Sequence, residues 1–324
     1  MILAGDVGAT KTMLGLFASD NSRPTLVRRQ TFHSAAYAGL TPIVREFLQG
    51  GEPVEMASFG VAGPVIGDSA EVTNLSWKVE AKALAEDLGI EDVCLVNDLV
   101  ATGYGIGSLT EEDFMVVNQG QPVAGANAAL IAAGSGLGEC TLYWDGCRYV
   151  PLPAEAGHAD FAPYDDTSLE LLRYLRHRTS SVGIEHIISG PGLLNIYDFL
   201  RDSTNLRETP EIVDRMRQSD RAAVIAQAAM AGECQLCVRT LCIFVSAYGA
   251  EAGNLALRSL ALGGVYVAGG IARKILPWMT QGAFMAAFAN KDRQAAMLSR
   301  IPVRVVLNEA APLFGAVTYL LQRK

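Results

Sequence analysis

Three apolar segments of strand character each run directly into a glycine-rich turn. The turns are Gly5–Thr10, Gly134–Gly138 and Gly269–Gly270, and the segments before them are Ile2–Ala4, Ala129–Ile131 and Val265–Val267. Glycine lets the backbone approach an anion closely and adopt a positive φ, so several N–H groups can converge on phosphate oxygens. Any one cluster could be an ordinary hairpin turn, but three of them behind apolar strands favour phosphate binding.

The first two turns resemble each other beyond their glycines. Another strand-like run follows each of them, Met13–Phe17 after the first and Cys140–Trp144 after the second. This repetition predicts one strand–turn–strand unit used twice. A duplicated phosphate-binding hairpin in turn predicts a nucleotide held between two related domains.

Two commoner glycine motifs do not fit these turns. A Walker A loop reads G-x-x-x-x-G-K-[ST], but Thr10 stands where its second glycine belongs. A Rossmann fingerprint needs G-x-G-x-x-G between a strand and a helix, whereas Gly134, Gly136 and Gly138 are evenly spaced before another strand-like run. A mononucleotide P-loop and a dinucleotide site are therefore both disfavoured.

Length and composition narrow the class of protein. A chain of 324 residues is long for one hydrophobic core, so two domains are expected. The net charge of −8 argues against a nucleic-acid partner, because binding to a phosphate backbone needs clustered Lys and Arg. We find no apolar stretch of membrane-spanning length and expect a cytoplasmic protein without a membrane partner.

The cysteines include one C-x-x-C pair, Cys234 and Cys237. A structural zinc site wants a second pair or a nearby histidine, and all four histidines lie upstream of this pair. We therefore favour packing over zinc. The residues from Arg221 to Tyr248 read as one long buried helix, in which cysteine serves as a small hydrophobe.

Strand and helix signals alternate along the first hundred residues, which predicts an α/β domain. The expected strands are 2–5, 13–17, 26–32, 57–61 and 93–96, and the expected helices are about 42–49 and 80–88. A second set of strands follows from Phe114 to Val150, and a mostly helical part from Thr167 to Leu262. A strand at 303–307 and an apolar helix at about 312–322 complete the chain, and we expect this helix to return to the first domain.

Polar residues follow several of these strands. Asn97 and Asp98 stand between a strand and a helix, where they could be an N-cap or could place a carboxylate at the ligand-binding edge of a sheet. The helix N-terminus would help to keep Asp98 ionised, which makes it a candidate general base. Glu155 and His158 flank Gly157 and follow Pro153, so they belong to a loop that is suited to binding a polyhydroxylated ligand or is an incidental surface loop. Glu185 and the segment around Asn74 are ambiguous by themselves.

Taken in order, these motifs resemble those of the bacterial hexose-kinase-type glucokinases of the actin-like ATPase superfamily, and the match runs end to end. The family's first phosphate loop corresponds to Gly5, Asp6, Val7, Gly8, Ala9 and Thr10, and its second to Gly134, Ser135 and Gly136. Its adenosine-binding segment matches residues 263–271, with Gly269 and Gly270. Its sugar-site motifs match Asn74, the Asn97–Asp98 pair, Glu155, His158 and Glu185.

The resemblance implies a two-domain actin-like (ribonuclease H-like) α/β fold with an interdomain cleft. The small domain would be residues 1–107 plus 308–324, and the large domain residues 108–307. The implied reaction is phosphorylation of glucose by ATP with Mg²⁺, in a protein that is commonly a homodimer. Asp98 would be the general base, and Asp6 would organise the metal through water. Thr10 and Ser135 would lie near the phosphates, and Asn74, Asn97, Glu155, His158 and Glu185 would contact the sugar.

Two positions depart from the family pattern, because Ala9 and Ala156 stand where glycine is usual. Ala9 narrows the first phosphate loop, and Ala156 lies between two implied sugar ligands. A kinase for fructose, mannose or an N-acetylated amino sugar therefore remains an alternative, as does a non-catalytic sensor of sugar and ATP. We also expect Gly136→Val to weaken ATP binding while leaving glucose binding nearly intact.

Overall fold

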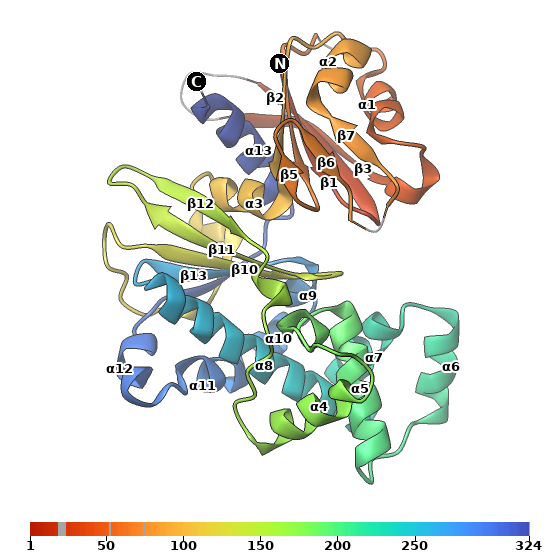
Figure 1. The fold of residues 1–324 in the computed structure, drawn as a ribbon, viewed down its shortest axis with the longest axis vertical. Coiled ribbons are helices and arrows are strands. Elements are labelled where there is room, and N and C mark those ends of the chain that lie inside the picture. Colours follow the sequence, from red (N-terminus) through yellow and green to blue (C-terminus); the bar gives the residue numbers. More distant parts are fainter. Residues whose placement is uncertain (19–23, 52, 74, 324) are drawn as a thin grey trace. The chain divides into compact units, whose positions relative to one another are not determined.

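The computed structural model describes residues 1–18, 24–51, 53–73 and 75–323 and divides into two compact units (Figure 1). Unit 1 comprises Met1–Asp113, Cys147–Pro153 and Asn308–Lys324, and unit 2 comprises Phe114–Gly146 and Ala154–Leu307. The domain boundaries expected from the sequence stay a prediction. Both units combine helices with a β-sheet, so the expected α/β class is confirmed.

The main sheet of unit 1 contains the first glycine-rich turn. Its strand order is β3 (Thr25–His33), β2 (Lys11–Ala18), β1 (Ile2–Val7), β4 (Met56–Val61) and β8 (Asp92–Asn97). β1 is antiparallel to β2 and parallel to β4, which is parallel to β8. The register pairs Val7 with Val61 and Val61 with Asn97, so the parallel strands end level with one another. The residues that follow β1 and β8 therefore lie at the same edge of the sheet.

Side chains of β1 alternate between two cores. Leu3 and Val7 belong to one core, and Ile2 and Ala4 belong to the other. A strand that is buried on both faces reads as a continuous apolar run, which is why this strand was recognisable in the sequence. The helices α1 (Leu40–Leu48) and α2 (Ala81–Leu88) contribute to the first core.

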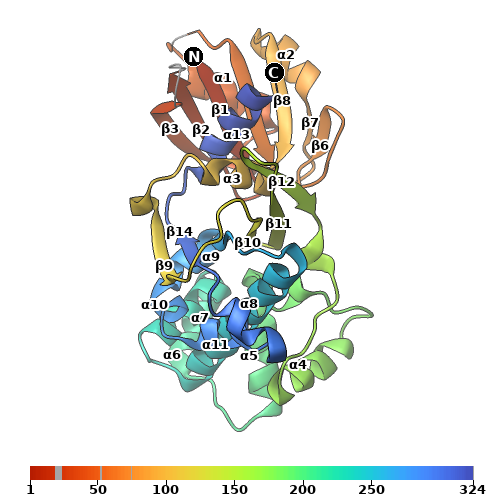
Figure 2. The same cartoon turned by 90° about the vertical axis from the view of Figure 1, so that its left-hand side faces the viewer.

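The second core of unit 1 is covered by α3 (Asp98–Ile106) and α13 (Ala311–Gln322). α13 packs against α3, β1 and β4 (Figure 2). Glycines let the two helices approach closely: a Cβ on Gly105 would overlap the carbonyl of Ala311, and a Cβ on Gly315 would overlap that of Ala101. This close contact packs α13 along Ala101–Gly105 of α3, the helix that begins at Asp98.

A small antiparallel sheet in unit 1 has no counterpart among the expected strands. It consists of β5 (Val65–Ile66), β6 (Ser69–Glu71) and β7 (Lys78–Glu80). Strands of two or three residues are too short to give a periodic signal. Asn74, an expected sugar ligand, falls in this region but lies outside the described residues.

The sheet of unit 2 repeats the plan of unit 1. Within unit 2 its strand order is β11 (Leu137–Trp144), β10 (Ala128–Ala133), β13 (Gly264–Ala268), β14 (Val303–Val306) and β9 (Phe114–Asn118). The strand β12 (Tyr149–Ala154) falls, except for its last residue, within the residues of unit 1. As in unit 1, the hairpin strand β10 is antiparallel to β11 and parallel to β13, and β13 is parallel to β14. The expected duplication of a strand–turn–strand unit is confirmed at the level of topology.

The prediction of one long helix from Arg221 to Tyr248 is wrong. The chain forms two helices there, α7 (Arg221–Met230) and α8 (Gln235–Ser259), separated by a turn in which Gly232 has φ +68°. The other helices of unit 2 are α4 (Asp166–Arg176), α5 (Gly190–Ser203), α6 (Pro210–Gln218), α9 (Gly270–Lys274), α10 (Leu276–Met279), α11 (Ala283–Ala289) and α12 (Ala295–Leu298). α8 contacts α5, α7, α11 and β10, and it forms the centre of the unit (Figures 1 and 2).

Among the described helices, α8 alone is long and apolar enough to cross a membrane. The expectation that no segment reaches this length is therefore wrong for α8. Most of this helix is buried inside unit 2, as the core helix of a soluble protein would be. Its apolar composition is explained by packing against both the sheet and the surrounding helices.

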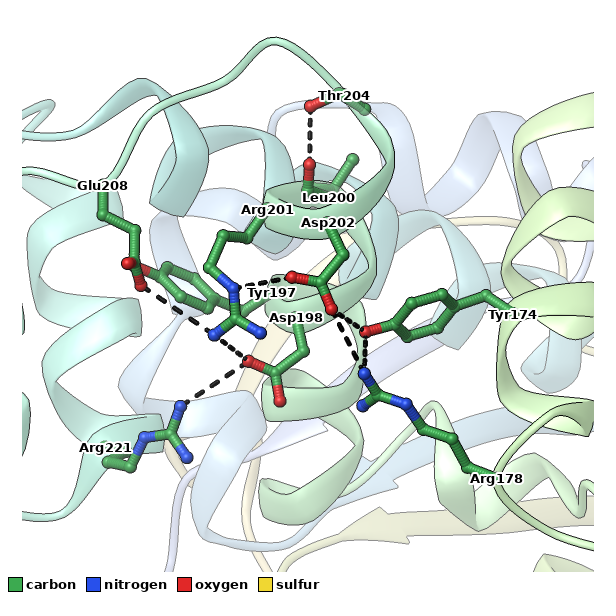
Figure 3. Close-up of polar contacts among 10 residues, drawn as sticks. All are labelled: Tyr174, Arg178, Tyr197, Asp198, Leu200, Arg201, Asp202, Thr204, Glu208 and Arg221. Atoms are coloured by element: carbon green, nitrogen blue, oxygen red, sulfur yellow. Dashed lines mark hydrogen bonds and ion pairs between the residues drawn. The ribbon is translucent and has the colours of Figure 1, made fainter.

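A network of hydrogen bonds and ion pairs connects α4 and α7 to the C-terminal end of α5 (Figure 3). Asp202 accepts hydrogen bonds from Arg201 Nε at 2.8 Å and from Tyr174 Oη of α4 at 2.5 Å. Asp198 pairs with Arg201 at 2.8 Å and with Arg221 of α7 at 3.7 Å. Because these side chains are partly exposed, we expect each pair to contribute little stability. The network links α4 and α7 to the C-terminal part of α5.

Candidate functional site

The first glycine-rich turn connects β1 and β2, and buried hydroxyl groups support it. Ser34 Oγ donates to the carbonyl of Gly8 at 2.6 Å and lies 3.0 Å from Thr12 Oγ1, while Ser34 N–H donates to the carbonyl of Thr10 at 3.2 Å. These contacts fix the turn from its interior side and leave the Thr10 side chain exposed. Sequence reasoning missed Ser34, because it follows β3 and carries no local motif.

Asn97 and Asp98 occupy different positions at the start of α3. Asn97 is the N-cap of α3: its Oδ1 accepts from the N–H groups of Leu99 at 3.0 Å and Val100 at 3.2 Å. Its amide also donates to the carbonyl of Gly63 at 3.2 Å. Asp98 is the first helical residue, half-buried, with Oδ1 accepting from Leu99 N–H at 2.8 Å. The cap is thus supplied by Asn97, and the Asp98 carboxylate lies at the positive end of the helix.

Asp6 lies at the same edge of the sheet as Asp98. Asp6 pairs with Gly60 of β4, and Gly60 pairs with Val96 of β8. A Cβ on Gly60 would be 3.1 Å from the Cβ of Ala101 and 3.5 Å from the Cα of Asp98, so this glycine lets α3 approach β4. Unit 1 therefore brings together the first turn, the half-buried Asp6, and the Asn97–Asp98 pair.

The second glycine-rich turn connects β10 and β11 and binds a carboxylate of its own unit. Leu137 N–H donates to Glu185 Oε2 at 2.9 Å, and Gly190 N–H donates to the carbonyl of Gly134 at 2.9 Å. A Cβ on Gly136 would lie 2.5 Å from Glu185 Oε2. A valine at Gly136 would displace Glu185, so the expectation that it spares an expected sugar ligand is inconsistent with this geometry.

Glu155 precedes a short 3-10 turn, η3 (Ala156–His158), and His158 is the last residue of this turn; both side chains are exposed. Gly157 in this turn is buried, and a Cβ there would overlap the carbonyl of Leu137. The carbonyl of Ala159 accepts from Ile184 N–H at 2.9 Å, which joins η3 to the turn that carries Glu185. The structure thus brings together the backbone turns of Glu155, His158 and Glu185 beside the start of β11.

The third glycine-rich turn begins where β13 ends. Gly269 has φ +86°, a conformation that favours glycine, and a Cβ there would overlap the carbonyl of Ala133 at the end of β10. Gly270 is the first residue of α9. Ser135 in the neighbouring turn is exposed. Unit 2 therefore brings two glycine-rich turns together at the carboxyl ends of β10 and β13, and Glu155, His158 and Glu185 lie near the second of these turns.

The described ranges contain no group of three or more His, Cys, Asp or Glu side chains that could hold a metal ion. Cys234 and Cys237 are free and buried. Asp6 offers a half-buried carboxylate at the end of β1. One or two carboxylates suit Mg²⁺ when most of its other ligands are water and substrate phosphates.

Comparisons with known proteins point to one family. The glucokinase family model matches residues 3–323. Glucokinase from Nostoc punctiforme is 40% identical, over 98% of this chain and 97% of that protein. The crystal structure of a glucokinase from an Antarctic psychrotroph has 27% identity and a TM-score of 0.84, covering 99% of this chain and 98% of the other.

A more distant structure, a ROK family glucokinase from Streptomyces griseus in complex with glucose and AMPPNP, has 18% identity and a TM-score of 0.67, covering 99% of each chain. At this identity the likeness concerns the fold alone. The family model and the relative that is 40% identical carry the assignment. The chain belongs to the glucokinase family.

Proposed function

We propose that this enzyme transfers the γ-phosphoryl group of ATP to the 6-hydroxyl of glucose, with Asp98 as the general base. The observation that carries the role of Asp98 is that Asn97, and not Asp98, caps α3. A half-buried carboxylate at the ligand-binding edge of a parallel sheet is well placed to accept a proton. Asp98 would take the proton of the 6-hydroxyl as its oxygen attacks the γ-phosphorus of ATP.

The glycine-rich turns are proposed to bind ATP. Phosphoryl transfer passes through a loose transition state, so the protein mainly has to align the groups and neutralise charge. The backbone of Gly5–Thr10, Gly134–Gly136 and Gly269–Gly270 would bind the nucleotide, with the Thr10 and Ser135 hydroxyls near the phosphates. Asp6 would hold Mg²⁺ through water, and the metal ion would supply positive charge at the phosphate oxygens.

Asn74, Asn97, Glu155, His158 and Glu185 are the proposed sugar ligands. A site that hydrogen-bonds the hydroxyl groups of its substrate rejects sugars that leave those protein groups unpaired. We therefore expect glucose to be preferred over fructose, mannose and N-acetylglucosamine, although Ala156 lies between two of these ligands. The relative from Streptomyces griseus, solved with glucose and AMPPNP, supports a site for both substrates on this fold.

We further propose an actin-like fold with the substrates in a cleft between a small domain (1–107 and 308–324) and a large domain (108–307). Both domains contribute proposed ligands of ATP and of the sugar, which supports this arrangement. A cytoplasmic homodimer is proposed from the family resemblance, and α8 is assigned to the core of the large domain.

An ADP-release assay with a panel of hexoses tests this function. With Mg·ATP, glucose should give the highest kcat/KM, and 6-deoxyglucose should give no ADP above background because it lacks the accepting hydroxyl. An equal or higher kcat/KM for another sugar would overturn the substrate assignment. Binding of ATP without turnover of any sugar would favour a sensor instead of an enzyme.

A further inference from the structure

A buried tyrosine of α8 lies between the ends of the two strands that lead into the second and third glycine-rich turns. Tyr248 is 0% exposed. Its hydroxyl accepts a hydrogen bond from Ala133 N–H at 3.1 Å and donates one to the carbonyl of Ala268 at 3.4 Å. Ala133 is the last residue of β10, and Ala268 is the last residue of β13.

These two bonds occur where the parallel pair separates. The register of β10 and β13 ends with Ala132 opposite Ala268, and beyond this pair the chains turn away into Gly134 and Gly269. Buried backbone N–H and carbonyl groups need hydrogen-bond partners, and the ends of a sheet are where ladder partners run out. The Tyr248 hydroxyl bonds to one backbone group at each of the two strand ends.

The ring of Tyr248 is held firmly. It makes edge-to-face contacts with Phe244, at 6.0 Å between ring centroids, and with Phe284 of α11, at 5.8 Å. Burial raises the pKa of Tyr248 above its ordinary value, so the hydroxyl remains protonated and can donate to Ala268. The Gly269 backbone packs against Ala133 from the other side, where a Cβ would overlap the Ala133 carbonyl.

We propose that Tyr248 is a positioning residue for the nucleotide: its hydroxyl holds the second and third glycine-rich turns at the spacing that ATP binding requires. The proposal rests on the assignment of these two turns to ATP, made above. Backbone N–H groups bind phosphate well only when their positions are fixed before the ligand arrives. Glu185, the proposed sugar ligand next to the second turn, is bonded to Leu137 of β11, whereas Tyr248 bonds to Ala133 and Ala268, so glucose binding should depend less on Tyr248 than ATP binding does.

Tyr248→Phe removes the hydroxyl and keeps the packed ring. We expect the Kd of Mg·ATP, measured by calorimetry, to rise about tenfold, because the two turns lose the hydroxyl that holds their spacing and must be ordered when the nucleotide binds. The KM for ATP should rise in parallel, while the Kd of glucose changes by less than about threefold.

Tyr197→Phe is the matched control. Tyr197 is also 0% exposed, and its hydroxyl donates to Glu208 at 3.1 Å, away from both turns. This variant should lose stability without a change in ATP affinity. An ATP affinity of Tyr248→Phe within twofold of wild type, or an equal loss of affinity in Tyr197→Phe, would overturn the proposal.

If Tyr248→Phe does not fold, hydrogen exchange of the wild-type protein tests the proposal instead. The Ala133 amide should be protected before any nucleotide is added, and rapid exchange of this amide would also overturn the proposal. Titration of the wild-type protein with Mg·ATP distinguishes a failure of the proposed function from a failure of the role of Tyr248. No binding of Mg·ATP to wild type would refute the proposed function and this inference together, whereas normal wild-type binding with an unaffected Tyr248→Phe variant would refute only the role of Tyr248.

Discussion

Gly136→Ala should displace Glu185 without unfolding the protein. The new Cβ would lie 2.5 Å from Glu185 Oε2, which is closer than such atoms can approach. The atom that must move is the end of a flexible side chain and not backbone, so the fold can adapt. The carboxylate then gives up its hydrogen bond from Leu137 N–H, which is 2.9 Å long.

The size of the effect follows from the bonds that are lost. A hydrogen bond to a charged group contributes about 1.5–3 kcal/mol, and about 1.4 kcal/mol corresponds to a tenfold change in affinity. If Glu185 binds the sugar, its displacement should raise the Kd of glucose by about 10- to 150-fold. The free energy of unfolding should fall by only about 1 kcal/mol, because Glu185 is half-buried and water can replace part of the lost bond.

Calorimetric titration with glucose in the absence of nucleotide measures this change. Gly134→Ala is the control, since a Cβ on Gly134 would meet nothing within 4 Å, and its glucose affinity should equal that of wild type. A glucose Kd unchanged in folded Gly136→Ala would refute the reasoning, because either Glu185 does not move or it does not bind the sugar.

Two further predictions concern stability. Burial, followed by the negative charge of Glu251, raises the pKa of Glu139 to about 8, so the folded protein binds a proton that the unfolded chain releases near its ordinary value of 4.5. The stability from this group is therefore lost as pH rises from about 4.5 through about 8. Glu139→Gln should flatten the decline of the free energy of unfolding with pH, measured by urea unfolding between pH 6 and 9. Parallel pH dependences in the wild type and the variant would contradict this prediction. Gly105→Ala should lower the free energy of unfolding by about 1–3 kcal/mol, because its Cβ would overlap the Ala311 carbonyl. Gly107→Ala is the control and should leave the free energy of unfolding unchanged, because its Cβ would meet nothing within 4 Å. Equal urea midpoints of the two variants would count against the close packing of α3 and α13.

The sequence predicted those features that have a local signal. Apolar runs followed by glycine-rich turns predicted β1, β10 and β13, and the resemblance between the first two turns predicted the duplicated hairpin. The break between α7 and α8 was missed, because Gly232 sits among residues that otherwise suit a helix. The strands β5, β6 and β7 were missed because they are too short to show alternation.

Contacts between distant segments could not be predicted from one sequence. Ser34 supports the Gly8 turn, Tyr248 joins the ends of β10 and β13, and Glu185 bonds to Leu137. Each contact depends on tertiary packing that brings together residues twenty or more positions apart. The sequence therefore proposed the site residues by motif, while their supporting residues became visible only in the structure.

The role of Asp98 is the central claim, and kcat of Asp98→Asn tests it most directly. Asparagine keeps the size of the side chain and can still accept from Leu99 N–H, but it cannot take up the proton of the 6-hydroxyl. We expect kcat to fall by about 10²- to 10⁴-fold, the range typical of losing a general base, with a much smaller change in the Kd of glucose. Since Asn97 supplies the cap of α3, the melting temperature should not change. A near-normal kcat in a variant with an unchanged melting temperature would contradict the account and reduce Asp98 to a structural residue.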